Sequence, residues 1–109
     1  MNLEYDPSII EWFSNWSGTF NWDAGNQDKN VKHGINHLEI EQIFDAPIYI
    51  AGKIIQTLQE SRWLILGEWA EKGWSLIITT RGTQLRIISC RRQRKQEAIF
   101  YEESKKNKN

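Results

Sequence analysis

The feature that most restricts the fold is a series of three short apolar segments between residues 62 and 90. Arg62 to Gly67, Trp74 to Thr80 and Gln84 to Cys90 are rich in β-branched and aromatic residues, which is typical of strands. Arg81-Gly82 lies at the bend between the second and third segments, so a tight hairpin is expected there. The sequence therefore predicts a small antiparallel sheet in the second half of the chain.

The register of this hairpin decides which side chains face the core. If Thr80 faces Thr83, then Ile78 pairs with Leu85. The predicted core face then carries Trp74, Leu76, Ile78, Leu85, Ile87 and Ser89. The opposite face is mixed, and it carries Arg86 in mid-strand, where a sheet can present a charge to a ligand.

Helix signals come mostly before these strands. Asp6-Pro7 has the residues of an N-cap and a first helical position, and an apolar helical face follows at Ile9, Trp12, Phe13 and Trp16. A short strand is expected over 19–22, and Asp23 then caps a helix from about Gly25 to His33 that Gly34 closes.

Three further elements are predicted. Asn36 and Glu39 have the spacing of a capping box, so a helix begins there. Residues 48–50 form a short strand by their β-branched content. The pattern turns helical again from about Arg92 to Lys105, where Ile99 and Phe100 would dock the helix on the body of the protein.

The length of 109 residues is that of one domain, with a single core of two layers. We expect residues 1–18 to form an N-terminal helical extension, residues 19–104 the main domain, and residues 105–109 a frayed tail. No run of about 20 apolar residues and no signal peptide is visible, so no membrane span is expected. The lone Cys90 has no disulfide partner and no Cys/His cluster has zinc spacing, which predicts a cytoplasmic protein with neither metal nor cofactor.

Charge is distributed unevenly along a chain whose net charge is zero. Residues 1–60 hold nine acidic and three basic residues, whereas residues 61–109 hold five acidic and eleven basic residues. Residues 81–95 contain six bases and no acid. Such a block would attract phosphates or an acidic protein, although a solvated basic surface is an equally common explanation.

The polar segment 23–34 carries the best candidates for chemistry. His33 is one of only two histidines, and Lys29 and Lys32 lie beside it. Histidine is the side chain whose ordinary pKa allows it to exchange protons near neutral pH. The alternative is a structural histidine that binds a carbonyl at a helix end, where histidines are favoured.

Taken in order, several short motifs resemble the BrnT family of toxins, which are ribonucleases of type II toxin–antitoxin systems. The resemblance runs from about Phe20 to Glu103 and rests on Trp22-Asp23, Gly25-Asn26, Lys29-Asn30, Lys32-His33-Gly34, Glu39-Ile40-Glu41-Gln42-Ile43-Phe44, Glu60, Arg62, Gly67, Thr80-Arg81-Gly82, Arg86-Ile87-Ile88-Ser89-Cys90-Arg91 and Tyr101-Glu102-Glu103. It implies an α+β fold of RelE-like architecture, a small antiparallel sheet with helices packed on one face. It also implies RNA cleavage without metal, held in check by a cognate antitoxin that carries a DNA-binding segment, in a toxin–antitoxin hetero-oligomer.

Metal-free cleavage of RNA uses its own 2′-hydroxyl as nucleophile, so the site needs an acid/base group and cations around the phosphorus. His33 is the acid/base candidate. Arg86 and Arg62 are further catalytic candidates, because arginine forks match phosphate oxygens. The remaining candidates for binding RNA phosphates are Lys29, Lys32, Arg81 and Arg91.

The chain departs from the family pattern in three places. One residue fewer separates Asn30 from His33, Cys90 stands where a small residue is usual, and residues 1–18 lie outside the resemblance. In a helix, one missing residue rotates the following side chains by about 100°. The missing residue leaves open a catalytically degenerate homologue that binds protein or nucleic acid. The basic block at 81–95 leaves open a nucleic-acid-binding domain without chemistry.

Overall fold

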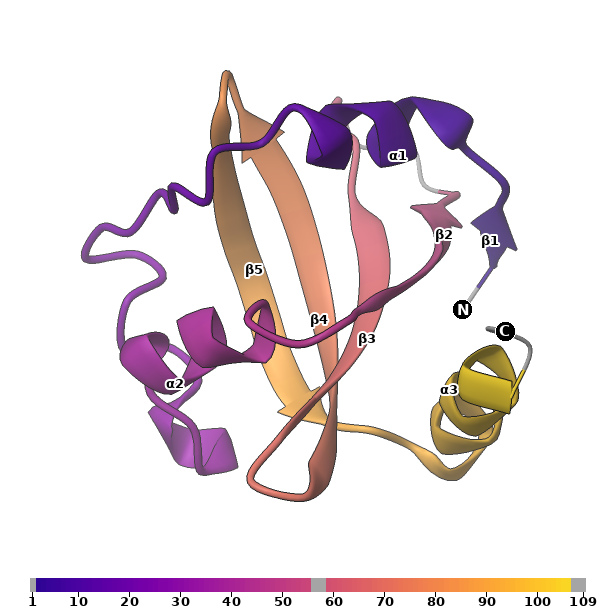
Figure 1. Cartoon of the computed structure of the whole chain (residues 1–109). Helices are drawn as coiled ribbons and strands as arrows, with labels where there is room; N and C mark the ends of the chain where they lie inside the picture. The colour runs from indigo at the N-terminus through magenta and orange to yellow at the C-terminus, as the bar shows by residue number, and fades with distance from the viewer. Residues whose placement is uncertain (1, 56–58, 107–109) are drawn as a thin grey trace.

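The computed structural model describes residues 2–55 and 59–106, and its centre is a five-stranded antiparallel sheet (Figure 1). The strands lie in the sheet in the order in which they follow along the chain. They are β1 (Leu3–Glu4), β2 (Tyr49–Ile54), β3 (Trp63–Trp69), β4 (Lys72–Arg81) and β5 (Gln84–Arg92). The three strands predicted between residues 62 and 90 are confirmed, whereas β1 was not expected.

Helices lie on both faces of this sheet. They are α1 (Pro7–Ser14), the short 3-10 helix η1 (Val31–His33), α2 (His37–Ile43) and α3 (Lys95–Lys106). Helices α1 and α2 pack on one face, and α3 packs on the other through Tyr101. The predicted α+β class with a small sheet is confirmed, with the refinement that α3 lies on the face opposite the other two helices.

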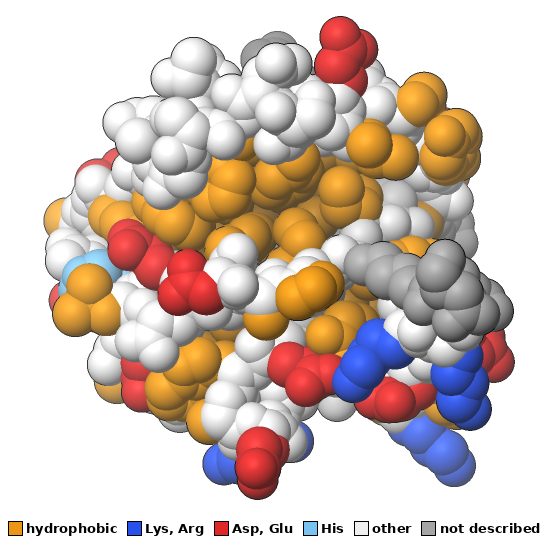
Figure 2. Space-filling view, in the orientation of Figure 1, with side chains coloured by type: hydrophobic (Ala, Val, Ile, Leu, Met, Phe, Trp, Pro, Cys, Tyr) orange, Lys and Arg blue, Asp and Glu red, His pale blue; other side chains and the backbone are white. Residues whose placement is uncertain are grey.

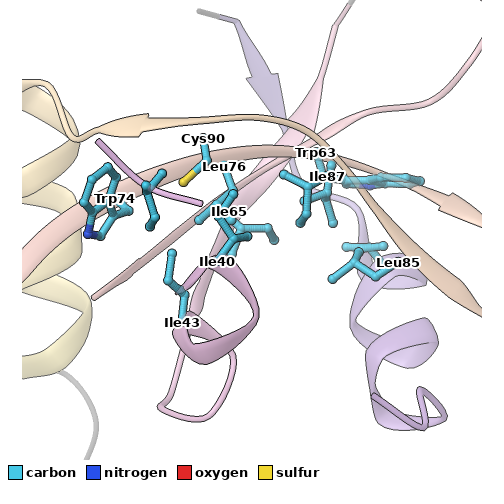
Figure 3. Close-up of a cluster of buried hydrophobic side chains, with 12 residues drawn as sticks. Ile40, Ile43, Trp63, Ile65, Trp74, Leu76, Leu85, Ile87 and Cys90 are labelled. Atoms are coloured by element: carbon cyan, nitrogen blue, oxygen red, sulfur yellow. The ribbon is translucent and has the colours of Figure 1, made fainter. Parts of the chain in front are cut away.

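The main core fills the space between the sheet and the two N-terminal helices (Figure 3). Ile65, Leu76 and Ile87 point from three adjacent strands toward Ile40 and Ile43 of α2, and all five side chains are buried. Burial of each such side chain contributes about 1.5–3 kcal/mol to folding. Residues 1–18 are part of this core, because Ile9 of α1 is also buried in it.

The helix boundaries follow local signals in the sequence. The Asp6 carboxylate accepts the Ser8 amide at 3.1 Å and caps α1. Asn36 and Glu39 form the predicted capping box, each side chain accepting the backbone amide of the other at 2.9 Å. These signals act within one helical turn, which is why they can be recognised from the sequence.

The predicted hairpin is present, but its register differs from the expectation. Thr80 pairs with Leu85 rather than facing Thr83, so Gly82 and Thr83 form a two-residue loop in which Gly82 has a φ of 61°. The shift is two residues, and the predicted core face near the turn is therefore kept. Farther along, a register shift between Ile77 and Ile78 leaves an extra residue in β5.

Because of this β-bulge, one residue that was expected in the core is wrong. Beyond it, Cys90 rather than Ser89 points into the core, and the Cys90 side chain is fully buried. An extra residue in one strand of a pair inverts the facing of all residues that follow it. The bulge cannot be recognised from the alternation of polar and apolar residues alone.

Two predicted elements between residues 19 and 33 are wrong. The strand over 19–22 is reduced to a single bridge between Phe20 and Leu85. The helix expected from Gly25 to His33 is a series of turns that ends in η1. Gly34 does close it, with a φ of 86°. Asp23 and Asn26 bind nearby backbone groups with their side chains, which competes with helix formation.

The docking residues predicted for the C-terminal helix are also wrong. Ile99 and Phe100 are largely exposed, and Tyr101 packs against Leu64 and Leu66 instead. The helix continues through Lys106, so two residues of the expected tail are helical, whereas 107–109 lie outside the described residues.

Candidate functional site

The segment from Thr19 to His33 runs along the open edge of β5. The backbone of Thr19 and Asn21 binds both polar groups of Leu85, with N–O distances of 3.0 and 2.8 Å. Farther along, side chains replace the backbone: Asn26 Nδ2 donates to the carbonyl of Ile87 at 3.1 Å, and Asn30 Oδ1 accepts the amide of Cys90 at 2.9 Å. The polar groups at this sheet edge are thereby satisfied by an irregular segment.

The two asparagines that make these bonds are buried, with 3% and 2% of their surface exposed. Asn26 also donates to the carbonyl of Asn21 and accepts the amide of Asp23. Sequence reasoning did not assign them a role, because an asparagine in a polar loop is ordinarily solvated. They hold the segment that carries His33 against β5.

Arg86 reaches from β5 to the start of this segment. Its guanidinium binds the Asp23 carboxylate at 2.9 and 3.2 Å and the side-chain oxygen of Asn21 at 2.7 Å. The hydrogen bonds from Arg86, and then the one from the Gly25 amide, hold the pKa of Asp23 below its ordinary value. The Arg86 side chain is 15% exposed, and an RNA phosphate would reach it by competing with this carboxylate.

Arg62 and Arg81 meet at the other end of the mixed face of the sheet. Both guanidiniums pair with Glu60, Arg62 at 3.5 Å and Arg81 more closely. The Arg81 hydrogen bond is the main reason that the pKa of Glu60 is lowered. The Nε of Arg62 is buried and has no hydrogen-bond partner among the described residues. By strand alternation, both arginines lie on the same face as Arg86.

Arg91 is committed to a structural pair. It forms a two-pronged ion pair with Glu97 of α3, at 2.8 and 2.9 Å. Burial alone would raise the pKa of Glu97, but hydrogen bonds from Arg91, the Arg94 amide and Ser75 outweigh burial and lower this pKa to about 2. The pair fastens α3 to the sheet, so Arg91 is the predicted phosphate ligand that the geometry supports least.

His33 lies at the exposed end of the segment, with Lys29 and Lys32 near it in the chain and also exposed. In the described part of the chain, no hydrogen bond or ion pair joins its imidazole to another side chain. The segment is anchored at Cys90, four residues beyond Arg86 and about 13 Å farther along β5.

The predicted site residues thus fall into three groups rather than one preformed pocket. His33, Lys29 and Lys32 share the segment along β5, Arg86 stands at its start, and Arg62 with Arg81 surround Glu60. The expected rotation of about 100° per residue assumed an α-helix from Gly25 to His33, whereas only Val31–His33 are helical, as the 3-10 helix η1. Within residues 2–55 and 59–106, no cluster of three or more His, Cys, Asp or Glu could hold a metal ion.

Comparison with known proteins identifies a family for this chain. The family model described as the ribonuclease toxin BrnT of type II toxin–antitoxin systems matches residues 22–97, which is more than half of the chain. This range contains the segment along β5 from Trp22 onward, and it also contains Arg62, Arg81, Arg86 and Arg91. No curated individual protein matches the chain. Among the described residues, no helix is long and apolar enough to cross a membrane.

Proposed function

Because the chain belongs to the BrnT family of ribonuclease toxins of type II toxin–antitoxin systems, we propose that it cuts RNA by attack of the 2′-hydroxyl on the adjacent phosphate. In this mechanism the nucleophile is part of the substrate, so the protein supplies proton transfer and cations. One observation carries the proposal: an exposed histidine and two exposed lysines lie on a segment fixed along the strand that bears Arg86.

His33 is the proton-transfer group in this proposal. Its imidazole is solvent-exposed and has no competing side-chain partner among the described residues, so a substrate hydroxyl can reach it. Lys29 and Lys32 attract the RNA backbone to the same segment. The imidazole removes the proton from the 2′-hydroxyl as the O2′–P bond forms, and the leaving 5′-oxygen takes a proton from water as the P–O5′ bond breaks.

The arginines act as phosphate ligands. Arg86 lies in β5, the strand beside the segment that carries His33. Its two-pronged geometry matches phosphate as well as it matches the Asp23 carboxylate that it binds in the free protein. Arg62 and Arg81 extend the basic surface along the mixed face and bind the flanking backbone. An RNA strand would bridge the three groups, which no hydrogen bond or ion pair joins to one another within residues 2–55 and 59–106.

Cleavage of a short single-stranded RNA in the presence of a chelator tests this mechanism. We expect cleavage to persist without metal, to leave a cyclic phosphate, and to stop when the nucleotide 5′ to the cut carries 2′-deoxyribose. Cleavage that needs a divalent cation would refute the metal-free mechanism, and cleavage of the deoxy substrate would refute 2′-hydroxyl attack.

A type II toxin has an antitoxin as its partner. We propose further that this antitoxin carries a DNA-binding segment, that the two proteins form a hetero-oligomer, and that they act on RNA in the cytoplasm. Coexpression with the product of the adjacent gene tests the pairing. Growth arrest by the toxin alone, relieved by that product, is the expected result.

A further inference from the structure

The sheet face that carries α1 and α2 is only partly covered. These helices have eight and seven residues, so each is about 10–12 Å long, whereas β4 alone, with ten residues, is about 33 Å long. Half-buried rings fill the space between the helices. Figure 2 shows the result, a hydrophobic area at the centre of this face.

The aromatic patch consists of Phe13, Trp16, Phe20, Trp22 and Phe44, which come from α1, from the segment that follows it, and from the end of α2. Its rings contact one another. Phe44 lies 5.7 Å from Trp16 and 5.5 Å from Phe20 between ring centroids, and Phe20 stacks on Trp22 at 6.1 Å. None of the five is fully buried. A cluster of rigid aromatic side chains that are only partly buried is the composition of a protein-binding hot spot.

The two stretches of chain that supply the rings carry charge of one sign. Residues 1–28 and 33–52, which supply all five rings, contain eight acidic residues and neither lysine nor arginine. Glu41 accepts the Trp22 indole at 2.7 Å, and exposed Asp45 directly follows Phe44. The arginines Arg62, Arg81 and Arg86 lie on the opposite face of the sheet. RNA is repelled from this acidic face, whereas a basic protein segment is attracted to it.

We propose that the aromatic patch binds an amphipathic segment of the antitoxin whose apolar side chains cover the rings and whose lysines or arginines meet Glu41 and Asp45. The inference rests on the family's possession of an antitoxin, and it names the surface and the chemistry of the partner. Apolar contacts at the centre and charges at the rim are the ordinary division of an interface. The patch lies on the other side of the sheet from the arginines proposed to bind RNA.

A pair of charge reversals tests the proposal. Asp45→Lys changes an exposed residue beside the patch, at a helix C-terminus where a positive charge is favoured, so the fold should not suffer. Glu103→Lys makes the same change on α3 and is the matched control. Binding of the purified product of the adjacent gene is measured by calorimetry at low and high salt. We expect Asp45→Lys to weaken binding about tenfold at low salt and less at high salt, and Glu103→Lys to change it less than twofold.

A second variant tests the rings. Phe44→Leu keeps an apolar side chain at the centre of the patch, and we expect it to weaken binding about tenfold at both salt concentrations. Circular dichroism and thermal unfolding establish that each variant is folded. Equal binding by Asp45→Lys, Phe44→Leu and wild type would overturn the proposal, as would failure of the gene product to bind at all or a patch occupied by a second copy of this chain in solution.

The same samples separate this inference from the proposed cleavage. Free Asp45→Lys protein should cut RNA at the wild-type rate, because the variant leaves His33 and the arginines unchanged. If wild type does not cut RNA but its binding depends on Asp45, the cleavage mechanism fails and the docking surface stands. If wild type cuts RNA and the substitutions of Asp45 and Phe44 leave binding unchanged, only the docking surface is refuted.

Discussion

Asn30 and Cys90 are joined by a hydrogen bond in which the asparagine side-chain oxygen accepts the cysteine backbone amide at 2.9 Å. Both residues are buried, at 2% and 0% exposure. The bond connects an irregular loop to an edge strand where regular structure would place another strand. It fixes the loop three residues before His33, so the position of the proposed acid/base group depends on it.

Removal of this bond should destabilise the protein. We expect Asn30→Ala to lower the free energy of unfolding by about 1–3 kcal/mol, because the buried Cys90 amide loses its partner. Urea denaturation monitored by tryptophan fluorescence measures the change. Asn2→Ala alters an exposed asparagine and should change stability by less than about 0.5 kcal/mol. Equal effects of the two variants would show that the loop is not held by Asn30.

Loss of the imidazole should remove activity without affecting the fold. We expect His33→Ala to lower the rate of RNA cleavage by about 10²–10⁴-fold, the usual contribution of general acid–base catalysis. Its unfolding temperature should stay at the wild-type value, since the side chain is exposed. His37→Gln is the control. A His33→Ala protein that cuts RNA at the wild-type rate would exclude this histidine from catalysis.

Substitution of Arg86 and substitution of its partner Asp23 should change RNA affinity in opposite directions. Asp23→Asn removes the charge that competes with phosphate but keeps an acceptor for the Gly25 amide, so we expect RNA to bind several-fold more tightly. Arg86→Lys cannot form two parallel bonds to phosphate and should bind RNA more weakly. Filter binding with a non-cleavable 2′-deoxy strand measures both. Unchanged affinity in both variants would exclude Arg86 as a phosphate ligand.

The attachment of α3 should depend on pH. The folded pKa of Glu97 is about 2, below the ordinary 4.5, so its stabilising contribution is full above pH 4.5 and is lost as pH falls toward 2. We expect Glu97→Gln to be less stable than wild type at pH 7 by about 1–2 kcal/mol, allowing for solvent screening, and the difference to vanish near pH 2. Denaturation at several pH values tests this. A difference that persists at pH 2 would contradict the assignment.

The single thiol should be unreactive in the folded protein. Burial raises the pKa of Cys90 to about 12, and its side chain is inaccessible. At pH 8 we expect no modification by a thiol reagent within the lifetime of the folded state, and rapid modification in denaturant. Fast labelling of the native protein would show that the edge of β5 opens readily, which would weaken the role given to Asn30.

Local features of the sequence determined much of the secondary structure. Asp6 and Pro7 begin α1, Asn36 and Glu39 begin α2, and alternating apolar residues mark β3, β4 and β5, because each signal acts between residues a few positions apart. The family could also be identified from the sequence, since motifs in a fixed order do not depend on knowing the fold.

Only the tertiary structure decided which residues meet across long separations. A bulge placed Cys90 in the core, Asn26 and Asn30 replaced the helix expected before His33, and the carboxylates of Asp23, Glu60 and Glu97 divided the arginines into separate groups. Before His33, the local backbone bonds of a helix compete with side-chain bonds from Asp23, Asn26 and Asn30 to residues of β5 that are 60–63 positions away. A single sequence specifies the first kind of bond directly, but the second kind exists only after the sheet has assembled and brought the partners together.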